Sequence, residues 1–108
     1  MVNILDKIIE DKKESLKNIK KNNSLDNLEN IIKSLNNFLN FKDAISNNKG
    51  VSLITEIKKA SPSAGELVKD FNHLNIAKMY IDNGATCLSV LTEEKHFLGK
   101  LDYIRDIK

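Results

Sequence analysis

A carboxylate and an ammonium group two residues apart, Glu56 and Lys58, are the side chains of this sequence best placed to do chemistry. They lie at the end of a β-rich run, Val51 to Ile57, which predicts a buried strand. Residues two apart in a strand point to the same face, so Ile54, Glu56 and Lys58 line one side. At the C-terminal end of a strand in a parallel α/β protein, such a pair can bind an anion or transfer protons. A plain ion pair at a strand end, or two solvated edge residues, is the alternative.

The segment after this run, Lys59 to Gly65, brings hydroxyl groups close to the pair. The hydroxyls of Ser61 and Ser63, together with backbone amides, could hold a phosphate or a carboxylate, and Pro62 would stiffen the loop. An ordinary strand-to-helix turn would have the same composition, so this segment by itself is a weak signal.

The strand that carries the pair is the first of two predicted strands that alternate with helices. A helix with an apolar stripe follows it, with Asn72 as a candidate N-cap and Asn83-Gly84 as its end. Thr86 to Leu91 is the second strand, and a further amphipathic helix starts near Leu101. This βαβα order implies parallel strands joined by right-handed crossovers. A stable sheet usually needs three or more strands, so the chain looks unfinished at its C-terminal end.

The first 49 residues contain no Gly and no Pro, and their apolar residues recur at helical spacing. A break at Asn22-Asn23-Ser24 divides them, and Ser24 is a natural N-cap for the second helix. Phe41, Ala44 and Ile45 indicate a further short turn before Gly50. The two stripes are Leu5, Ile8, Ile9, Leu16 and Ile19, and then Leu25, Leu28, Ile31, Ile32, Leu35 and Leu39.

Length and composition bound the possible functions. With 108 residues the chain allows one small domain at most, and a complete eight-stranded barrel needs about 250. A single cysteine cannot form an internal disulfide, which excludes a disulfide scaffold. No apolar run is long enough to span a membrane. The charged residues Asp6 and Lys7 stand where a signal peptide would have its apolar core. We therefore expect a cytoplasmic protein with no membrane partner.

The net charge of +2 gives little support for nucleic-acid binding. Sixteen of the 17 basic residues are Lys, whereas base and phosphate readers favour Arg. The lysines near the N-terminus alternate with acids, and pairs such as Glu14 with Lys17 have the spacing of a solvated helix face. We expect no nucleic-acid partner, and salt-dependent binding would be the sign of one.

Other candidate residues have ordinary explanations. His73 and His96 have no Cys or second His at ligand spacing, so no metal site is predicted. Cys87 lies in the second strand and is expected to be an inert core thiol. Lys100 and Lys108 lie on or beside the last helix and are expected to be solvated.

One stretch of the sequence closely resembles the signature of a known family. The run Leu53-Ile54-Thr55-Glu56-Ile57-Lys58-Lys59-Ala60-Ser61-Pro62-Ser63 resembles the signature of indole-3-glycerol phosphate synthase. Further similarity lies in Leu88-Ser89-Val90-Leu91-Thr92-Glu93 and in Phe97-Leu98-Gly99, which look like that family's second strand and the loop after it. The resemblance covers essentially all of this chain but well under half of a family member.

The resemblance implies a fold. The family is a (β/α)8 TIM barrel, so the chain would be its α/β N-terminal part. Residues 1–49 would form a helical extension, and residues 50–108 would form about two of the eight βα units.

The resemblance also implies a reaction in tryptophan biosynthesis. The family converts 1-(2-carboxyphenylamino)-1-deoxyribulose 5-phosphate to indole-3-glycerol phosphate, CO2 and water, as a carboxy-lyase without metal or organic cofactor. Glu56 and Lys58 match its first-strand catalytic residues, and Ser61 and Ser63 would contact the phosphorylated substrate. Pro62 and Phe97 would help to enclose the anthranilate ring.

The family's other catalytic residues lie on later strands, beyond Lys108. The chain alone is therefore predicted to have no synthase activity. The alternative is a non-catalytic partial barrel, which associates with itself through open strand edges or complements another fragment.

Overall fold

The structure, a computed structural model, describes residues 3–108. The chain divides into two compact units, Met1–Leu39 and Asn40–Lys108. The predicted boundary between a helical extension and a barrel portion, at residues 49 and 50, stays a prediction, and residues 1 and 2 of that extension lie outside the described part. None of the helices in residues 3–108 is both long and apolar enough to cross a bilayer.

The first unit consists of two helices, α1 (Ile4–Asn22) and α2 (Leu25–Ser34). The predicted break between them is confirmed, and the Ser24 hydroxyl caps α2 by accepting from the amide of Asn27 at 3.1 Å. The predicted pair of Glu14 and Lys17 is an ion pair of 2.9 Å on an exposed helix face. Such pairs contribute little to stability, which agrees with a solvated face.

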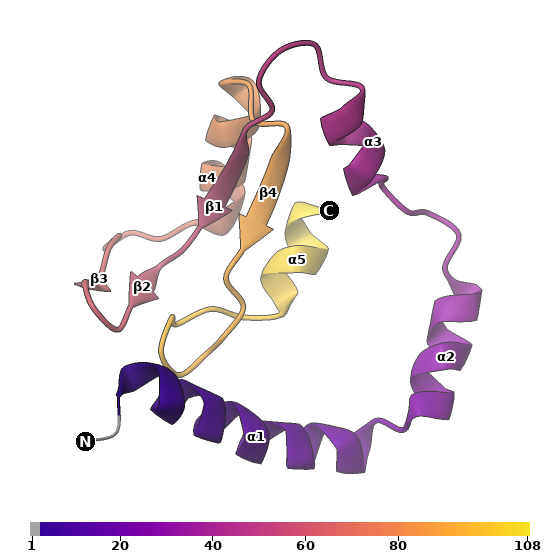
Figure 1. Cartoon of the computed structure of the whole chain (residues 1–108), viewed down its shortest axis with the longest axis vertical. Helices are drawn as coiled ribbons and strands as arrows, with labels where there is room; N and C mark the ends of the chain where they lie inside the picture. The colour runs from indigo at the N-terminus through magenta and orange to yellow at the C-terminus, as the bar shows by residue number, and fades with distance from the viewer. Residues whose placement is uncertain (1–2) are drawn as a thin grey trace. The chain divides into compact units, whose positions relative to one another are not determined.

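The second unit contains the strands and is built around a short parallel pair. Its elements in chain order are α3 (Phe41–Ser46), β1 (Ile54–Ile57), β2 (Ala60–Ser61), β3 (Gly65–Glu66), α4 (His73–Asp82), β4 (Cys87–Val90) and α5 (Asp102–Ile107). β1 and β4 pair in parallel, as predicted, and α4 forms the crossover between them. Figure 1 shows β1 and β4 side by side, with α4 packed behind them. The α/β class and the βαβα order are confirmed.

Three details of the sequence interpretation are wrong. The first strand begins at Ile54, because only residues 54–57 pair with β4, and Val51 is 94% exposed. The segment after Lys59 contains a small antiparallel hairpin, β2 with β3, where a loop was expected. Cys87 is half-buried, since a sheet of two strands leaves part of each strand uncovered.

The core of the second unit is small and takes residues from β1, β2, α4 and α5. Its buried hydrophobic residues are Ile57, Ala60, Ala77 and Tyr103. Side chains of β1 alternate between its two faces, as predicted. Ile54 and Glu56 share one face and are exposed, whereas Ile57 lies on the other face and is buried. The sheet therefore packs one face against α4 and presents the face of Glu56 to its surroundings.

α4 and α5 are joined by a cluster of aromatic rings. The His73 ring stacks on Tyr103 with centroids 4.3 Å apart, and Phe71 lies 5.5 Å from the same ring. His73 Nε2 also lies 2.9 Å from Asp106 Oδ2. His73 begins α4, as the sequence indicated, and its contacts are those of a packing residue.

Candidate functional site

The centre of the candidate site is the pair Glu56 and Lys58 at the C-terminal end of β1. Lys58 Nζ lies 3.2 Å from Glu56 Oε1, and the two side chains are 33% and 47% exposed respectively. Ser89 Oγ on β4 lies 3.4 Å from the other carboxylate oxygen of Glu56. Three side chains from two adjacent strands therefore meet at one end of the sheet.

The pairing of the strands explains why these side chains meet. The register places Glu56 opposite Ser89, so both project from the same face of the parallel pair. Lys58 lies just beyond the strand, and its ammonium reaches back to Glu56. On the α4 side, the Tyr80 hydroxyl donates to the carbonyl of Glu56 at 2.9 Å, which fixes the backbone that carries the carboxylate.

The exposure of this pair bears on its role. An ion pair as exposed as this one contributes between about 0 and 1 kcal/mol to stability, so the fold does not depend on it. The site presents a proton acceptor beside a cation in a position that a ligand can reach. This arrangement can bind an anionic group and move a proton.

The predicted hydroxyl groups lie on the β2–β3 hairpin. Ser61 is in β2, and Pro62 and Ser63 are exposed in the turn that follows it. Ser61 Oγ lies 3.4 Å from Ser63 Oγ and accepts from the amide of Ala64 at 3.2 Å. This local hydrogen bonding makes a compact turn that carries both hydroxyls.

Phe97 lies half-buried in the loop that follows β4. Its amide donates to Glu93 Oε2 at 3.0 Å, and the amide of His96 donates to the same oxygen at 2.7 Å. The amide of Lys95 donates to Glu93 Oε1 at 3.0 Å. Glu93 thus binds the backbone of the segment that presents Phe97.

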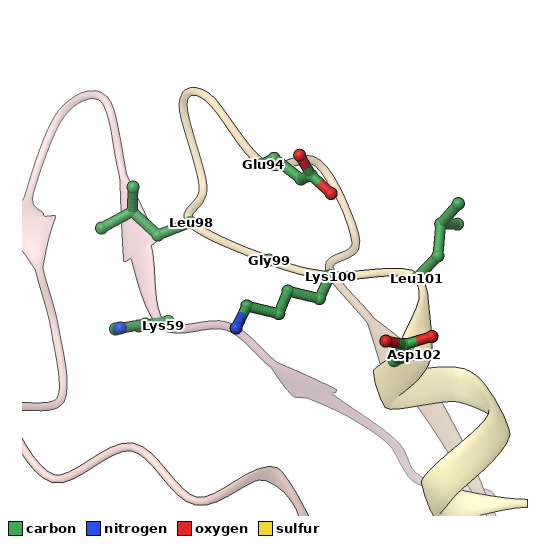
Figure 2. Close-up of a pocket in the computed structure, with 7 residues that line it drawn as sticks. All are labelled: Lys59, Glu94, Leu98, Gly99, Lys100, Leu101 and Asp102. Atoms are coloured by element: carbon green, nitrogen blue, oxygen red, sulfur yellow. The ribbon is translucent and has the colours of Figure 1, made fainter. Parts of the chain in front are cut away.

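An open pocket of about 470 Å³ lies between this loop and the segment that joins β1 to β2. Figure 2 shows Glu94, Leu98 and Lys100 on the loop after β4, with the Lys100 side chain extending towards the segment that carries Lys59. Lys100 lies before the first residue of α5 and is exposed, as expected for a solvated lysine. The pocket is adjacent to the candidate site, but Glu56 and Lys58 do not line it.

The six predicted site residues thus fall on three segments of the second unit. Hydrogen bonds or ion pairs join Glu56 to Lys58 and Ser61 to Ser63, and Phe97 stands on the loop after β4. Within residues 3–108, no cluster of three or more His, Cys, Asp or Glu could hold a metal ion.

Sequence reasoning did not single out Ser89, which contacts Glu56, or Glu93, which binds the backbone of the segment that carries Phe97. The only sequence signal for Ser89 is that it is a polar residue within the second predicted strand. Aligning the predicted strands at either end would bring Leu91 or Val90 opposite Glu56, and only the observed register pairs Glu56 with Ser89. Glu93 gave no such signal, because its partners are backbone amides, which every residue except proline possesses.

Comparison with known proteins agrees with the resemblance of the β1 segment. The family described as indole-3-glycerol phosphate synthase has a model that matches residues 5–108. A protein named indole-3-glycerol phosphate synthase in Desulforamulus reducens is 45% identical over 105 residues, covering 97% of this chain and 40% of that protein. A protein of the same name in Clostridium acetobutylicum is 45% identical over 106 residues, with the same coverage of each chain.

A relative in Aliarcobacter butzleri, also named indole-3-glycerol phosphate synthase, is 43% identical over 108 residues, which cover 41% of its length. The chain thus spans about 40% of the length of the curated relatives that it matches. Both the family match and these identities extend over both structural units. The chain belongs to the indole-3-glycerol phosphate synthase family.

Proposed function

We propose that this chain supplies the first-strand part of an indole-3-glycerol phosphate synthase active site. The complete site would convert 1-(2-carboxyphenylamino)-1-deoxyribulose 5-phosphate to indole-3-glycerol phosphate, CO2 and water. The single observation that carries the proposal is the Glu56–Lys58 pair, at the C-terminal end of a parallel strand in a chain of this family. Ligand sites of parallel α/β folds are built at that end of the strands.

In this proposal Lys58 and Glu56 are the catalytic residues of this chain. The Lys58 ammonium binds an anionic group of the substrate and gives a proton to the ribulose carbonyl oxygen as the aromatic ring carbon attacks. The Glu56 carboxylate, 3.2 Å from that ammonium, orients it and accepts a proton in the acid–base steps. Loss of CO2 restores the aromatic ring. The new hydroxyl group then leaves as water after it takes a proton from a general acid, while a base removes a proton from the ribulose carbon bonded to nitrogen.

The remaining predicted residues would bind the substrate. The hydroxyls of Ser61 and Ser63 lie on one turn and can donate to anionic oxygens. Pro62, between them, and Phe97, on the loop after β4, would enclose the anthranilate ring. No metal or organic cofactor and no nucleic acid are part of the proposal.

A hybrid enzyme tests this assignment. Residues 5–108 would replace the matching portion of the Clostridium acetobutylicum relative, of which this chain covers 40%. We expect the hybrid to turn over the carboxyphenylamino substrate. Lys58→Ala in the hybrid should lower kcat by at least about 100-fold, the scale of a lost general acid.

The matched control in the hybrid is Lys78→Ala, which removes an exposed lysine of α4 that pairs with Asp82. We expect this variant to keep the activity of the parent. A hybrid that is folded but inactive, or a Lys58→Ala variant with the parent rate, would overturn the assignment.

We also propose that the chain by itself is inactive and that the protein acts in the cytoplasm. The chain spans about 40% of its relatives, and the proposed chemistry needs groups from further strands. Measurable turnover by the purified 108-residue chain would contradict this part of the proposal.

A further inference from the structure

The loop after β4 is organised by the side chain of Glu93. Three successive backbone amides, those of Lys95, His96 and Phe97, donate to its two carboxylate oxygens at 3.0, 2.7 and 3.0 Å. Hydrogen bonds to a charged acceptor are stronger and more directional than those between neutral groups. Glu93 therefore fixes the orientation of the peptide that precedes the Phe97 ring.

The main chain closes the same loop from the other end. The carbonyl of Glu93 accepts from the amide of Gly99 at 2.8 Å. Leu98 has a φ of 52°, a conformation that side chains with a Cβ rarely adopt. A Cβ on Gly99 would lie 2.2 Å from the carbonyl oxygen of Leu91, so only glycine fits there. The backbone is therefore fixed on both sides of Phe97, by the Glu93 carboxylate before it and by the constrained conformations of Leu98 and Gly99 after it.

The ionised form of Glu93 is the form that binds the loop. Burial alone would raise the pKa of the Glu93 carboxyl, but the amides of His96, Phe97 and Lys95, with the charge of His96, hold the pKa below its usual value. A carboxylate that accepts several backbone N–H bonds is stabilised in its charged state. The same contacts therefore favour both the charge and the loop conformation.

We propose that Glu93 is a positioning residue of the substrate site: its carboxylate holds the loop in the conformation that presents the Phe97 ring to the substrate's anthranilate ring. This inference rests on the proposed function, because it takes Phe97 as part of the ring enclosure. Glu93 acts through Phe97 and need not touch the substrate.

The hold on the loop is tested in the chain itself. Amide hydrogen exchange and amide chemical shifts of residues 95–97 would be compared between the parent and Glu93→Ala. We expect the amides of His96 and Phe97 to exchange at least about 10-fold faster in Glu93→Ala. Without the carboxylate, the loop can open without first breaking hydrogen bonds to these amides. The exchange rates and chemical shifts of amides in β4 and α4 should be the same as in the parent.

Glu94→Ala is the matched control for this measurement. It removes the same charge from the neighbouring exposed residue of the same loop. We expect it to leave exchange at residues 95–97 at the parent rate. Unchanged exchange in Glu93→Ala, or an equal acceleration in both variants, would overturn the proposed hold.

The consequence for substrate binding is tested by a double-mutant cycle in the hybrid enzyme. Phe97→Ala removes a contact made with the bound substrate, so it should raise KM by about 10-fold and change kcat less. Glu93→Ala should raise KM in the same way, and Glu93→Gln, which keeps one acceptor oxygen, should raise it less. If Glu93 acts through Phe97, the double variant should have a KM within about 2-fold of Phe97→Ala alone.

The outcomes separate the two proposals. KM effects of Glu93→Ala and Phe97→Ala that multiply in the double variant would show that Glu93 does not act through Phe97. An inactive but folded parent hybrid would contradict the proposed function. In that case the exchange rates of the chain still decide whether Glu93 holds the Phe97 segment.

Discussion

At the scale of single residues, the hydroxyl of Thr55 in β1 lowers the stability of the fold, which the sequence did not reveal. Its Oγ1 is buried and has no hydrogen-bond partner among residues 3–108. A buried polar group left unpaired costs about 1–3 kcal/mol. We therefore expect Thr55→Val, which has nearly the same shape, to raise the free energy of unfolding by about 1 kcal/mol in urea titrations.

Thr86→Val is the matched comparison, because the Thr86 hydroxyl makes a hydrogen bond. Its Oγ1 accepts from the amide of Leu53 at 3.0 Å, just before the strands begin to pair. The same substitution here should lower the free energy of unfolding by about 1 kcal/mol, since a donor is left without its acceptor. The two substitutions should thus change the free energy of unfolding in opposite directions, and a decrease in Thr55→Val would refute the account of Thr55.

Glu93 gives a second prediction at this scale, on the dependence of the loop on pH. Burial opposes ionisation, but the amide bonds outweigh it and lower the pKa of Glu93 from its usual 4.5. Because the folded-state pKa is the lower one, the stabilisation is fully present above pH 4.5 and is lost as pH falls through the folded-state value.

Carboxyl ¹³C shifts measured during a pH titration would check this prediction. The midpoint of Glu93 should lie below that of an unfolded reference peptide, and the amide shifts of His96 and Phe97 should change at the same midpoint. In Glu93→Gln this step should disappear from the amide shifts. A midpoint for Glu93 at or above the reference would contradict the prediction.

At the scale of elements, the contact between α4 and α5 depends on Tyr103. This ring is buried, with His73 stacked on one side and Phe71 beside it. Truncation of a buried aromatic residue costs about 3–5 kcal/mol. In Tyr103→Ala we expect α5 to separate from α4, which amide exchange of residues 102–107 would detect. Arg105→Ala, which removes only exposed ion pairs of α5, should change exchange by far less.

The elements also show what the sequence can predict and what it cannot. Capping residues are local, so Ser24 and Asn72 predicted the starts of α2 and α4 correctly. The extent of a strand depends on its partner, so the true start of β1 at Ile54 could not be read from the run that begins at Val51. The β2–β3 hairpin depends on pairing between very short segments, for which periodicity gives no signal.

The same reasoning applies to the candidate site. Spacing along one strand predicted that Glu56 and Lys58 would lie on the same face, and the 3.2 Å ion pair between them agrees with that placement. The participation of Ser89 follows from register, and the hold of Glu93 on Phe97 follows from loop geometry. Both arise between segments, so a pattern within one segment does not contain them.

At the scale of the whole molecule, the parallel sheet of the second unit has too few strands to bury all of its apolar side chains. In the described part of the chain it has two strands, β1 and β4, and each has one edge without a partner strand. Leu53 and Ile54 are 48% and 50% exposed, and among residues 3–108 the fully buried large side chains are limited to Ile57. Open edges beside apolar surface favour pairing with another chain.

We therefore predict that the purified chain associates with itself. Sedimentation equilibrium from low to high micromolar concentration should show a mass that rises above that of the monomer. Ile54→Lys places a charge on the open face of β1 and should shift the chain towards the monomer. Met79→Lys, which changes an exposed residue of α4, should associate as the parent does.

Competition identifies the surface involved. The later part of the Clostridium acetobutylicum relative, which follows the portion matched here, should bind the chain and reduce its self-association, because both would cover the same strand edges. A chain that stays monomeric and unfolds cooperatively at every concentration would refute the prediction. Self-association that persists in Ile54→Lys and in the presence of the later part would show that another surface is responsible, such as the exposed apolar residues of the first unit.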